Sequence, residues 1–187
     1  KKIIDKYIFL PSRISSWKGH DLLLKYFSLL DKKYKDSFKI HLISLSKSKE
    51  EKKIDQLINK LHLSENITIS KPTLNINKLY QGASLVVNIS KRPEGFGRTI
   101  SEALSSAVPT IAPNQGGTKE QLNNFDKNLL FNVHSHKSFQ RALRYALKNY
   151  KLIKKKGRPY VKKNYSSYMM CKNTLEVYNH IVNQWIF

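Results

Sequence analysis

Residues 85–104, LVVNISKRPEGFGRTISEAL, decide the fold of this chain. The run at 85–89 is short, apolar and rich in β-branched residues, which is typical of a strand buried on both faces. A helix is predicted to begin near Arg98 or Thr99, and Gly95 and Gly97 stand in the turn between strand and helix. A strand, a glycine-containing turn and a helix in this order predict one βα unit of a parallel sheet.

The same alternation of short apolar runs and longer amphipathic runs extends along most of the chain. Strands are predicted at residues 7–10, 40–45, 67–70, 85–89, 110–112 and 129–131. Helices are predicted at 20–34 and 50–61, and Ser48 with Glu51 and Thr118 with Gln121 have capping-box spacing. Residues 137–150, 152–164 and 168–185 have helical patterns with no strand between them. These patterns predict a single α/β domain over residues 1–187, a doubly wound, Rossmann-like parallel sheet with C-terminal helices.

The composition is strongly basic: 34 Lys and Arg against 13 Asp and Glu give a formal net charge of +21. Such a charge favours nucleic acid, an anionic membrane surface or phosphorylated small ligands as partners. The alternative is a compositional bias, because lysine, asparagine and isoleucine are all plentiful, as in proteins from AT-rich genomes. The sequence has no zinc-finger spacing and no basic-aromatic RNA-binding signature, so nucleic acid is a minor candidate.

The single cysteine, Cys171, excludes an intramolecular disulfide and fits a reducing compartment, and its apolar neighbours predict that it is buried. The sequence has no run of about 18 apolar residues, which predicts no membrane span. The six histidines lack metal-ligand spacing, so we expect no metal site. We expect a cytoplasmic protein, with peripheral contact to the inner face of a membrane as an option. We also expect the sequence to begin inside a longer chain, because its first residue is not methionine.

A candidate binding site follows the strand at 85–89. The amino end of the next helix presents unpaired N–H groups and the positive end of its dipole, which suit a phosphate. Two carboxylates, Glu94 and Glu102, bracket this position and suit the hydroxyls of a ribose and of a sugar ring. The open alternative is that Thr99 and Glu102 form a capping box and that Glu94 is a solvated loop residue.

A second candidate segment is the loop after the first strand, residues 11–20, which carries Arg13, Lys18 and Gly19. Ligands of doubly wound sheets bind at the carboxyl ends of the strands, so this loop lies where binding is expected. Two fixed cations beside a glycine could hold a diphosphate. The alternative is a basic loop in a basic protein.

Together these segments resemble the C-terminal, donor-binding domain of the retaining GT-B glycosyltransferases of family 4, over about residues 7–178. Arg13-x4-Lys18-Gly19 is similar to the family's R-x4-KG clamp, and Glu94-x7-Glu102 is similar to its E-x7-E signature. Residues 109–120, PTIAPNQGGTKE, are similar to its P-V-I-A…GG…E run, and residues 164–166 and 177–178 resemble its closing helices. Four such segments in order make the resemblance specific.

The resemblance implies a role for each matched residue. Arg13 and Lys18 would bind the donor diphosphate, and Glu102 would hold the ribose hydroxyls. Glu94, Arg13 and Lys18 would be the catalytic residues. The other implied contacts are the backbone of Gly95, Phe96 and Gly97, with Glu94, for the transferred sugar, the N–H groups of Arg98 and Thr99 for the phosphate, and the loop near Lys71 for the base.

Two residues depart from the family pattern. Ala107 stands where the family usually has glycine before Pro109, which asks for different packing between helix and strand. Thr99 stands where an aliphatic residue is common, and its hydroxyl could add a phosphate contact.

The last predicted helix carries Val177, Tyr178 and Ile181 on an apolar stripe. We expect this stripe to pack on the sheet, with contact to an absent domain as the alternative. The final residues 185–187, WIF, are apolar enough to form a contact patch.

The implied activity is retaining transfer of a sugar from a nucleotide-diphosphate donor to a saccharide or lipid-linked acceptor, in bacterial surface polysaccharide or lipopolysaccharide synthesis. The acceptor would lie mainly on an N-terminal domain that these 187 residues lack, so we expect donor binding without transfer. We expect no cofactor and no requirement for Mg²⁺ or Mn²⁺, because the sequence has no Asp-x-Asp pair. The alternatives are a nucleotide-sugar epimerase on the same architecture and a non-catalytic nucleotide- or membrane-binding module.

Overall fold

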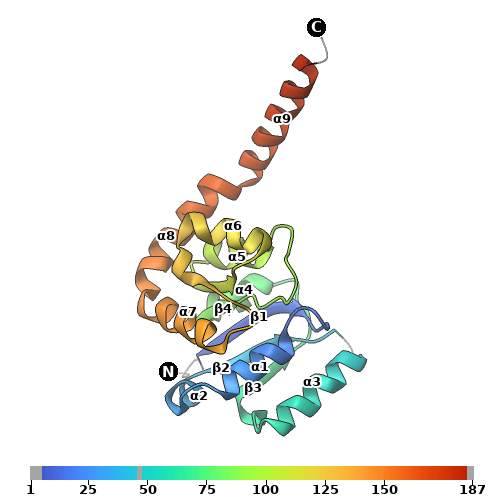
Figure 1. The fold of residues 1–187 in the computed structure, drawn as a ribbon, viewed down its shortest axis with the longest axis vertical. Coiled ribbons are helices and arrows are strands. Elements are labelled where there is room, and N and C mark those ends of the chain that lie inside the picture. Colours follow the sequence, from blue (N-terminus) through green and yellow to red (C-terminus); the bar gives the residue numbers. More distant parts are fainter. Residues whose placement is uncertain (1–5, 46–47, 185–187) are drawn as a thin grey trace.

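The computed structural model describes residues 6–45 and 48–184, which pack around one parallel sheet up to the end of α8, Tyr165 (Figure 1). Within these residues the sheet has six strands in the order β3-β2-β1-β4-β5-β6, all paired in parallel. The strands are β1 (Tyr7–Arg13), β2 (Lys39–Ile43), β3 (Ile67–Ser70), β4 (Leu85–Val87), β5 (Thr110–Pro113) and β6 (Leu130–Phe131). Each lies where the apolar pattern predicts a strand, so the doubly wound α/β fold is confirmed.

Both faces of the central strands are buried, as the unbroken apolar runs predict, whereas the edge strand β3 is partly exposed. Ile8 and Leu10 of β1 pack in the larger apolar cluster, whereas Phe9 between them packs in a second cluster with Tyr80 and Val86. Alternate side chains of one strand therefore serve two cores, one on each side of the sheet. Complete burial of side chains of this size stabilises the fold by about 1.5–3 kcal/mol each.

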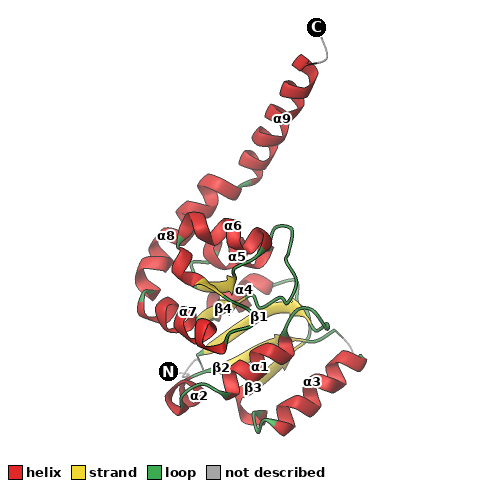
Figure 2. Ribbon diagram, viewed as in Figure 1, coloured by secondary structure: helices red, strands yellow, loops and turns green. Residues whose placement is uncertain are grey.

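Helices cover the two faces of the sheet (Figure 2). The helix α1 packs against α3 and α7, while α5 packs against α6 and α8. The α-helices are α1 (His20–Ser28), α2 (Lys32–Ser37), α3 (Lys49–Lys60), α4 (Ile76–Gly82), α5 (Arg98–Ser105), α6 (Gly116–Phe125), α7 (His136–Lys148), α8 (Tyr150–Tyr165) and α9 (Ser167–Gln184). Short 3₁₀ turns at Ser64–Asn66 and Lys127–Leu129 precede β3 and β6.

Two helical predictions need correction. The single helix predicted at 20–34 is wrong, because α1 ends at Ser28 and α2 begins after Asp31. Asp31 has an extended backbone with ψ of 146°, and its carboxylate pairs with Arg144 of α7 at 2.8 Å, so the chain turns here. The helix α4 has no counterpart among the helices predicted from the sequence.

The two capping-box predictions have opposite outcomes. At the start of α3, Glu51 N donates to Ser48 Oγ and Ser48 N donates to Glu51 Oε2, both at 3.1 Å, so this box is confirmed. The second is wrong, because α6 begins at Gly116 and the Thr118 hydroxyl donates to the carbonyl of Pro113. Gln121 directs its side chain to another loop, which is described below.

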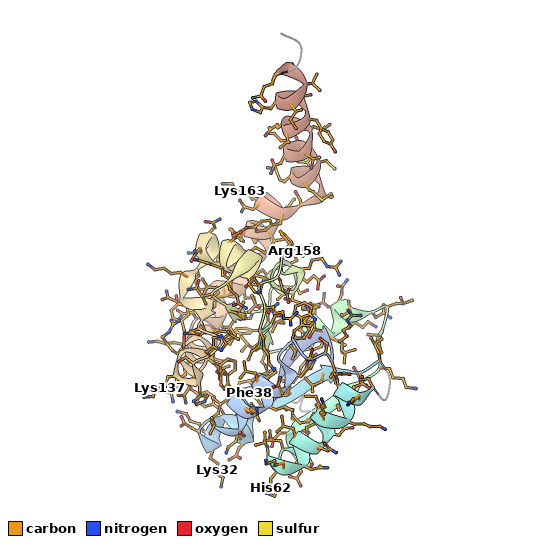
Figure 3. All side chains as sticks on the ribbon, turned by 45° about the vertical axis from the view of Figure 1, so that its right-hand side comes forward. Lys32, Phe38, His62, Lys137, Arg158 and Lys163 are labelled. Atoms are coloured by element: carbon orange, nitrogen blue, oxygen red, sulfur yellow. The ribbon has the colours of Figure 1, made fainter. Side chains whose placement is uncertain are left out.

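The last helix, α9, stands clear of the sheet and its covering helices (Figures 1 and 3). None of its described side chains is buried. The predicted packing of Val177, Tyr178 and Ile181 on the sheet is therefore wrong, and Cys171 is exposed rather than buried. The predicted contact patch at 185–187 lies outside the described residues.

The chain changes direction across the sheet between β3 and β4. It runs outward from β1 to β2 and β3, then returns to place β4 on the other side of β1. The loops that follow β1 and β4 consequently leave neighbouring strands in opposite directions and open a crevice at the carboxyl edge. This is the position where ligands bind in doubly wound folds.

Candidate functional site

The loops after β1 and β4 enclose a cavity of about 510 Å³ at the carboxyl edge of the sheet. The cavity is lined by Arg13, Lys18, Glu94, Gly95, Phe96, Gly97, Arg98, Thr99 and Glu102, nine of the ten predicted site residues. The tenth, Lys71, follows the edge strand β3 and is not among the lining residues. Pro11, Ser12, Trp17 and Pro93 also line the cavity and were not singled out from the sequence. The segment at residues 11–20, called the cationic loop below, and the amino end of α5 thus share one crevice.

Gly19 allows the cationic loop to lie against the neighbouring strand. Its φ of 76° lies in the left-handed region, and a Cβ there would meet the Ile89 carbonyl oxygen at 2.1 Å. A larger residue would push the loop away from the end of β4. The Lys91 N–H, which donates to the Trp17 carbonyl at 2.7 Å, joins the same two loops. These contacts fix Lys18 at the mouth of the cavity.

The amino end of α5 opens on the other side of the cavity. Gly97 precedes the helix with φ of 79°, and no side chain caps the first turn. The first-turn N–H groups of Arg98 and Thr99 are therefore left for a ligand or water, and the helix dipole adds positive potential there. Such an end is a site for an anion.

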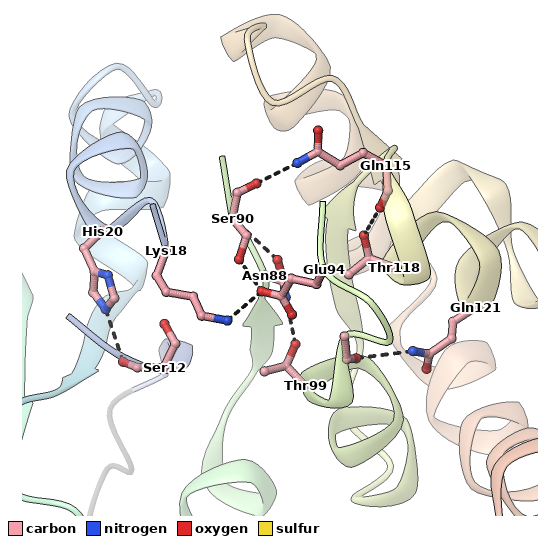
Figure 4. A network of polar contacts seen from close by, with 11 residues as sticks. Ser12, Lys18, His20, Asn88, Ser90, Glu94, Thr99, Gln115, Thr118 and Gln121 are labelled. Carbon is pink, nitrogen blue, oxygen red and sulfur yellow. Dashed lines mark hydrogen bonds and ion pairs between the residues drawn. The ribbon is translucent and has the colours of Figure 1, made fainter. Parts of the chain in front are cut away.

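Glu94 is the centre of the polar contacts in the cavity (Figure 4). Lys18 Nζ donates to its Oε1 at 2.7 Å, and the Ser90 hydroxyl donates to the same oxygen. Burial by itself would raise the pKa of Glu94, but the hydrogen bonds from Lys18 and Ser90 and the charge of Lys18 outweigh it and lower that pKa. Lys18 Nζ also lies 4.1 Å from the centre of the Trp17 ring. Glu94 is therefore an ionised carboxylate held in a defined position.

Glu102 is held from behind by a residue of the unpredicted helix α4. The Tyr80 hydroxyl donates to Glu102 Oε2 at 2.5 Å, and Tyr80 itself is completely buried. Burial, together with this hydrogen bond, raises the pKa of Tyr80 well above its usual range, so Tyr80 remains a donor. The capping-box alternative for Thr99 and Glu102 is not observed, because α5 has no side-chain cap.

Asn88 and Ser90 support the loop from below. Asn88 Nδ2 donates to Thr99 Oγ1 at 3.0 Å, and Ser90 N donates to Asn88 Oδ1 at 3.1 Å. Gln115 Nε2 donates to the Ser90 carbonyl at 2.9 Å. The Thr99 hydroxyl, a departure from the family pattern, thereby ties the first turn of α5 to the end of β4. The signal that could have identified them is polar character at the end of an apolar run, because Asn88 interrupts the run at 85–89 and Ser90 follows it.

Across residues 6–45 and 48–184, no group of three or more His, Cys, Asp or Glu side chains is placed to hold a metal ion. In the same residues, none of the helices combines the length and apolarity needed to cross a lipid bilayer. The charged groups at the cavity are those of Arg13, Lys18, Glu94, Arg98 and Glu102.

Comparison with known proteins is consistent across sequence and structure. Residues 3–163 match the family described as Glycosyl transferases group 1. A Haemophilus influenzae protein named as an uncharacterized glycosyltransferase is 26% identical over 121 residues, covering 65% of this chain and 33% of that protein. The mannosylfructose-phosphate synthase of Agrobacterium fabrum is 29% identical over 120 residues, covering 60% of this chain and 26% of the synthase.

Among solved structures, a glycosyltransferase from Rickettsia africae is 28% identical with a TM-score of 0.82, over 95% of this chain and 48% of that one. The Anabaena protein HepE, solved in complex with UDP and glucose, has a TM-score of 0.81 at 19% identity, over 94% of this chain and 49% of HepE. The second likeness shows the fold alone. The chain spans about half the length of these structures and about a third or less of the curated relatives it matches.

Proposed function

The chain belongs to the group 1 glycosyl transferases, and we propose that it is the domain that binds the nucleotide-diphosphate sugar donor of a retaining, family 4 enzyme. The observation that carries the proposal is the shared cavity, where Arg13 and Lys18 face the amino end of α5. The UDP bound by the structural neighbour HepE is consistent with such a donor.

The cationic side of the cavity suits the leaving group of glycosyl transfer. When the bond between the anomeric carbon and the phosphate oxygen breaks, negative charge builds on the departing diphosphate. Arg13, Lys18 and the helix amino end can stabilise that charge more strongly in the transition state than in the bound donor. This arrangement supports metal-independent transfer, in which protein cations take the part of Mg²⁺ or Mn²⁺.

The two carboxylates suit the hydroxyl-bearing parts of the donor. Glu102, oriented by Tyr80, accepts hydrogen bonds from the ribose hydroxyls, and Glu94 accepts them from the transferred sugar. The backbone at 95–97 completes the sugar subsite. We place the base toward the loop at Lys71, beyond the cavity that the other residues line.

Titration calorimetry with UDP, GDP and ADP tests the donor-binding proposal. Lys18→Met should weaken binding of the preferred nucleotide about tenfold or more, because a charge-assisted contact to phosphate is lost. Lys119→Met is the matched control, since Lys119 is exposed on α6 and does not line the cavity. The proposal would be contradicted if the wild type, Lys18→Met and Lys119→Met bound the nucleotide with equal affinity, or if the wild type bound none of the three nucleotides.

We further propose that the acceptor binds mainly to an N-terminal domain, so that these residues bind donor without transferring sugar. The length of the structural relatives, about twice that of this chain, supports this division. The exposed apolar side chains of α9, including Tyr168, Leu175, Tyr178 and Val182, supply a surface for the second domain. Robust sugar transfer by these 187 residues would refute the division of labour.

An anionic membrane surface, as the site of a lipid-linked acceptor, is favoured by the distribution of charge. Residues 127–175 contain 13 Lys and Arg and no Asp or Glu, so they account for +13 of the net +21. On α8, Lys151, Lys155, Arg158 and Lys162 recur at helical spacing on the side opposite the buried Ile153. Among the described residues, no ion pair within the salt-bridge distance involves this stripe. Such a stripe fits the inner face of a bacterial membrane, where lipopolysaccharide and other surface polysaccharides are begun.

Vesicle co-sedimentation tests the membrane proposal. The protein should bind phosphatidylglycerol vesicles but not phosphatidylcholine vesicles, and binding should fall as salt rises. Changing the four cations of the α8 stripe to glutamate should abolish binding, whereas the same change at Lys52, Lys53, Lys60 and Lys119 should reduce it far less. Equal losses for both variants would indicate a general charge effect without a specific surface.

The epimerase alternative is tested with the same protein by incubating it with donor and no acceptor. Formation of the epimeric nucleotide sugar would favour that alternative over transfer. A non-catalytic module is distinguished by joining this domain to the N-terminal half of its enzyme and measuring transfer.

A further inference from the structure

The loop that carries the proposed anion site is held in position by the neighbouring helix α6. Gly117 N donates to the Glu94 carbonyl at 2.8 Å. Gln121, one turn later on α6, donates from Nε2 to the Phe96 carbonyl at 2.5 Å and to the Gly97 carbonyl at 3.3 Å. Figure 4 shows the Gln121 amide and a hydrogen bond that it makes. Three carbonyl groups of the segment 94–97 therefore face α6.

The direction of these carbonyls determines where the loop N–H groups point. None of the described peptide bonds is cis, so the N–H of each following residue points opposite to the carbonyl of its own peptide plane. The carbonyls of Glu94, Phe96 and Gly97 face α6, so the N–H groups of Gly95, Gly97 and Arg98 face away from it. These three residues line the cavity, so the N–H groups that face away from α6 lie on the cavity side of the loop, where backbone N–H groups can bind an anion.

Gln121 is a buried polar residue whose side-chain amide has hydrogen-bond partners at both ends. It is 2% exposed, and its Oε1 accepts a hydrogen bond from Ser101 Oγ of α5 at 3.1 Å. The loop carbonyls of Phe96 and Gly97 can only accept, so they fix which end of the amide faces the loop, and the Ser101 hydroxyl donates to the other end. The Tyr160 hydroxyl of α8 donates to the Gln121 carbonyl at 2.8 Å and holds this turn of α6 in place. Burying an amide stabilises a fold only when its polar atoms find partners, and here the partners are the loop and α5.

We propose that Gln121 is a positioning residue that sets the backbone N–H group of Arg98 for the donor diphosphate, and with it the N–H group of Gly97 beside the sugar subsite. The proposal rests on the proposed function, because it assigns to Gln121 the orientation of the same phosphate site. Gln121 does not contact the ligand, and it acts through the peptide planes of the 95–98 loop. The affinity for the diphosphate therefore depends on a side chain outside the cavity.

Gln121→Met tests this proposal, because methionine has a similar shape and no amide to donate. Leu122→Ala is the matched control, since Leu122 is a fully buried neighbour on α6 that makes no polar contact with the loop. Both variants should lower thermal stability. Only Gln121→Met should weaken binding of the nucleoside diphosphate that calorimetry shows to be preferred. The expected loss is about tenfold, which corresponds to one hydrogen bond from a misaligned N–H group to the diphosphate.

Two readouts separate positioning from general destabilisation. The preference for the nucleoside diphosphate over its monophosphate should shrink in Gln121→Met and stay unchanged in Leu122→Ala. In amide NMR spectra of the wild type, the N–H signals of Gly97 and Arg98 should shift on addition of the diphosphate, and Gln121→Met should reduce those shifts. If Gln121→Met does not fold, Ser101→Ala is the second test, at a half-buried site. It should weaken diphosphate binding about threefold, because it removes the hydrogen bond that holds the Oε1 end of the Gln121 amide in place.

The outcomes distinguish this inference from the proposed function. If the wild type binds no nucleoside diphosphate, the proposed function is wrong and this inference falls with it. If the wild type binds and Gln121→Met binds equally well, or if Leu122→Ala loses as much affinity as Gln121→Met, only the role of Gln121 is overturned.

Discussion

Acidification should destabilise this domain through one buried side chain, His20. It lies in the first turn of α1 with 1% of its surface exposed, and its Nε2 is 3.2 Å from the Ser12 carbonyl oxygen. Its Nδ1 has no hydrogen-bond partner among the described residues. Burial lowers the pKa of His20 to about 4, against the raising effects of the Ser12 hydrogen bond and Asp21. Among the smaller effects, Lys18 lowers this pKa and Glu51 raises it.

The sign and size of the effect follow from linkage. The native pKa of about 4 lies below the unfolded value of 6.5, so the unfolded chain binds more protons between these two values. The contribution of neutral His20 to the free energy of unfolding is fully present above pH 6.5 and is lost as the pH falls toward 4. For one such site, the free energy of unfolding should drop by about 2.5 kcal/mol between about pH 7.5 and about pH 4.5.

Urea unfolding followed by circular dichroism measures this loss. The free energy of unfolding should be compared between the wild type and His20→Asn at several values of pH, so that carboxylates common to both proteins cancel. The wild type should lose about 2.5 kcal/mol more than His20→Asn over this range. His180→Asn, on the exposed helix α9, should follow the wild type at every pH.

A difference between wild type and His20→Asn that does not change with pH would refute the reasoning. It would mean that His20 is protonated in the folded protein, or that water reaches Nδ1.

Three further predictions concern the site and its surroundings. The first uses an enzyme that joins this domain to its N-terminal half. There Lys18→Ala should lower turnover about 10²–10³-fold, which is equivalent to about 3–4 kcal/mol of activation free energy. Turnover near that of the wild type would show that Lys18 does not bind the diphosphate. Ala107 has φ of 57°, in the left-handed region, so Ala107→Gly should raise the free energy of unfolding by about 1 kcal/mol in the same urea assay, and a loss of stability would contradict the strain. EDTA should leave the calorimetric affinity for the preferred nucleoside diphosphate unchanged, and a marked loss would indicate that a divalent metal binds with the nucleotide.

The strands and the location of the site were predictable because both depend on local pattern. Runs such as 85–87 are buried on both faces, so their apolar character is uninterrupted. The loops follow those strands directly, and the carboxyl-edge rule then places Arg13, Lys18 and Glu94 near each other. The left-handed Ala107 also lies where the resemblance marks a departure from glycine.

The parts that escaped prediction depend on distant partners. The helix α4 is short and has Tyr80 as its buried residue, so its periodic signal is weak although Tyr80 orients Glu102. The spacing of Thr118 and Gln121 suggests a local cap, but a loop 24 or 25 residues earlier takes the Gln121 amide. The apolar pattern around Cys171 shows which face of α9 is apolar and does not show what covers it.

The ion pair of Lys18 with Glu94 means that this cleft carries its own counter-ion. A phosphate that binds Lys18 competes with the Glu94 carboxylate for the ammonium group, and a carboxylate released in this way can accept from the hydroxyls of the sugar. When the diphosphate departs, the carboxylate can reclaim the ammonium group and hasten the exit of a tightly held product. Entry and release of the diphosphate are then exchanges of one anion for another at Lys18. The charge of the ammonium group is neutralised by Glu94 when the cleft is empty and by phosphate when the donor is bound.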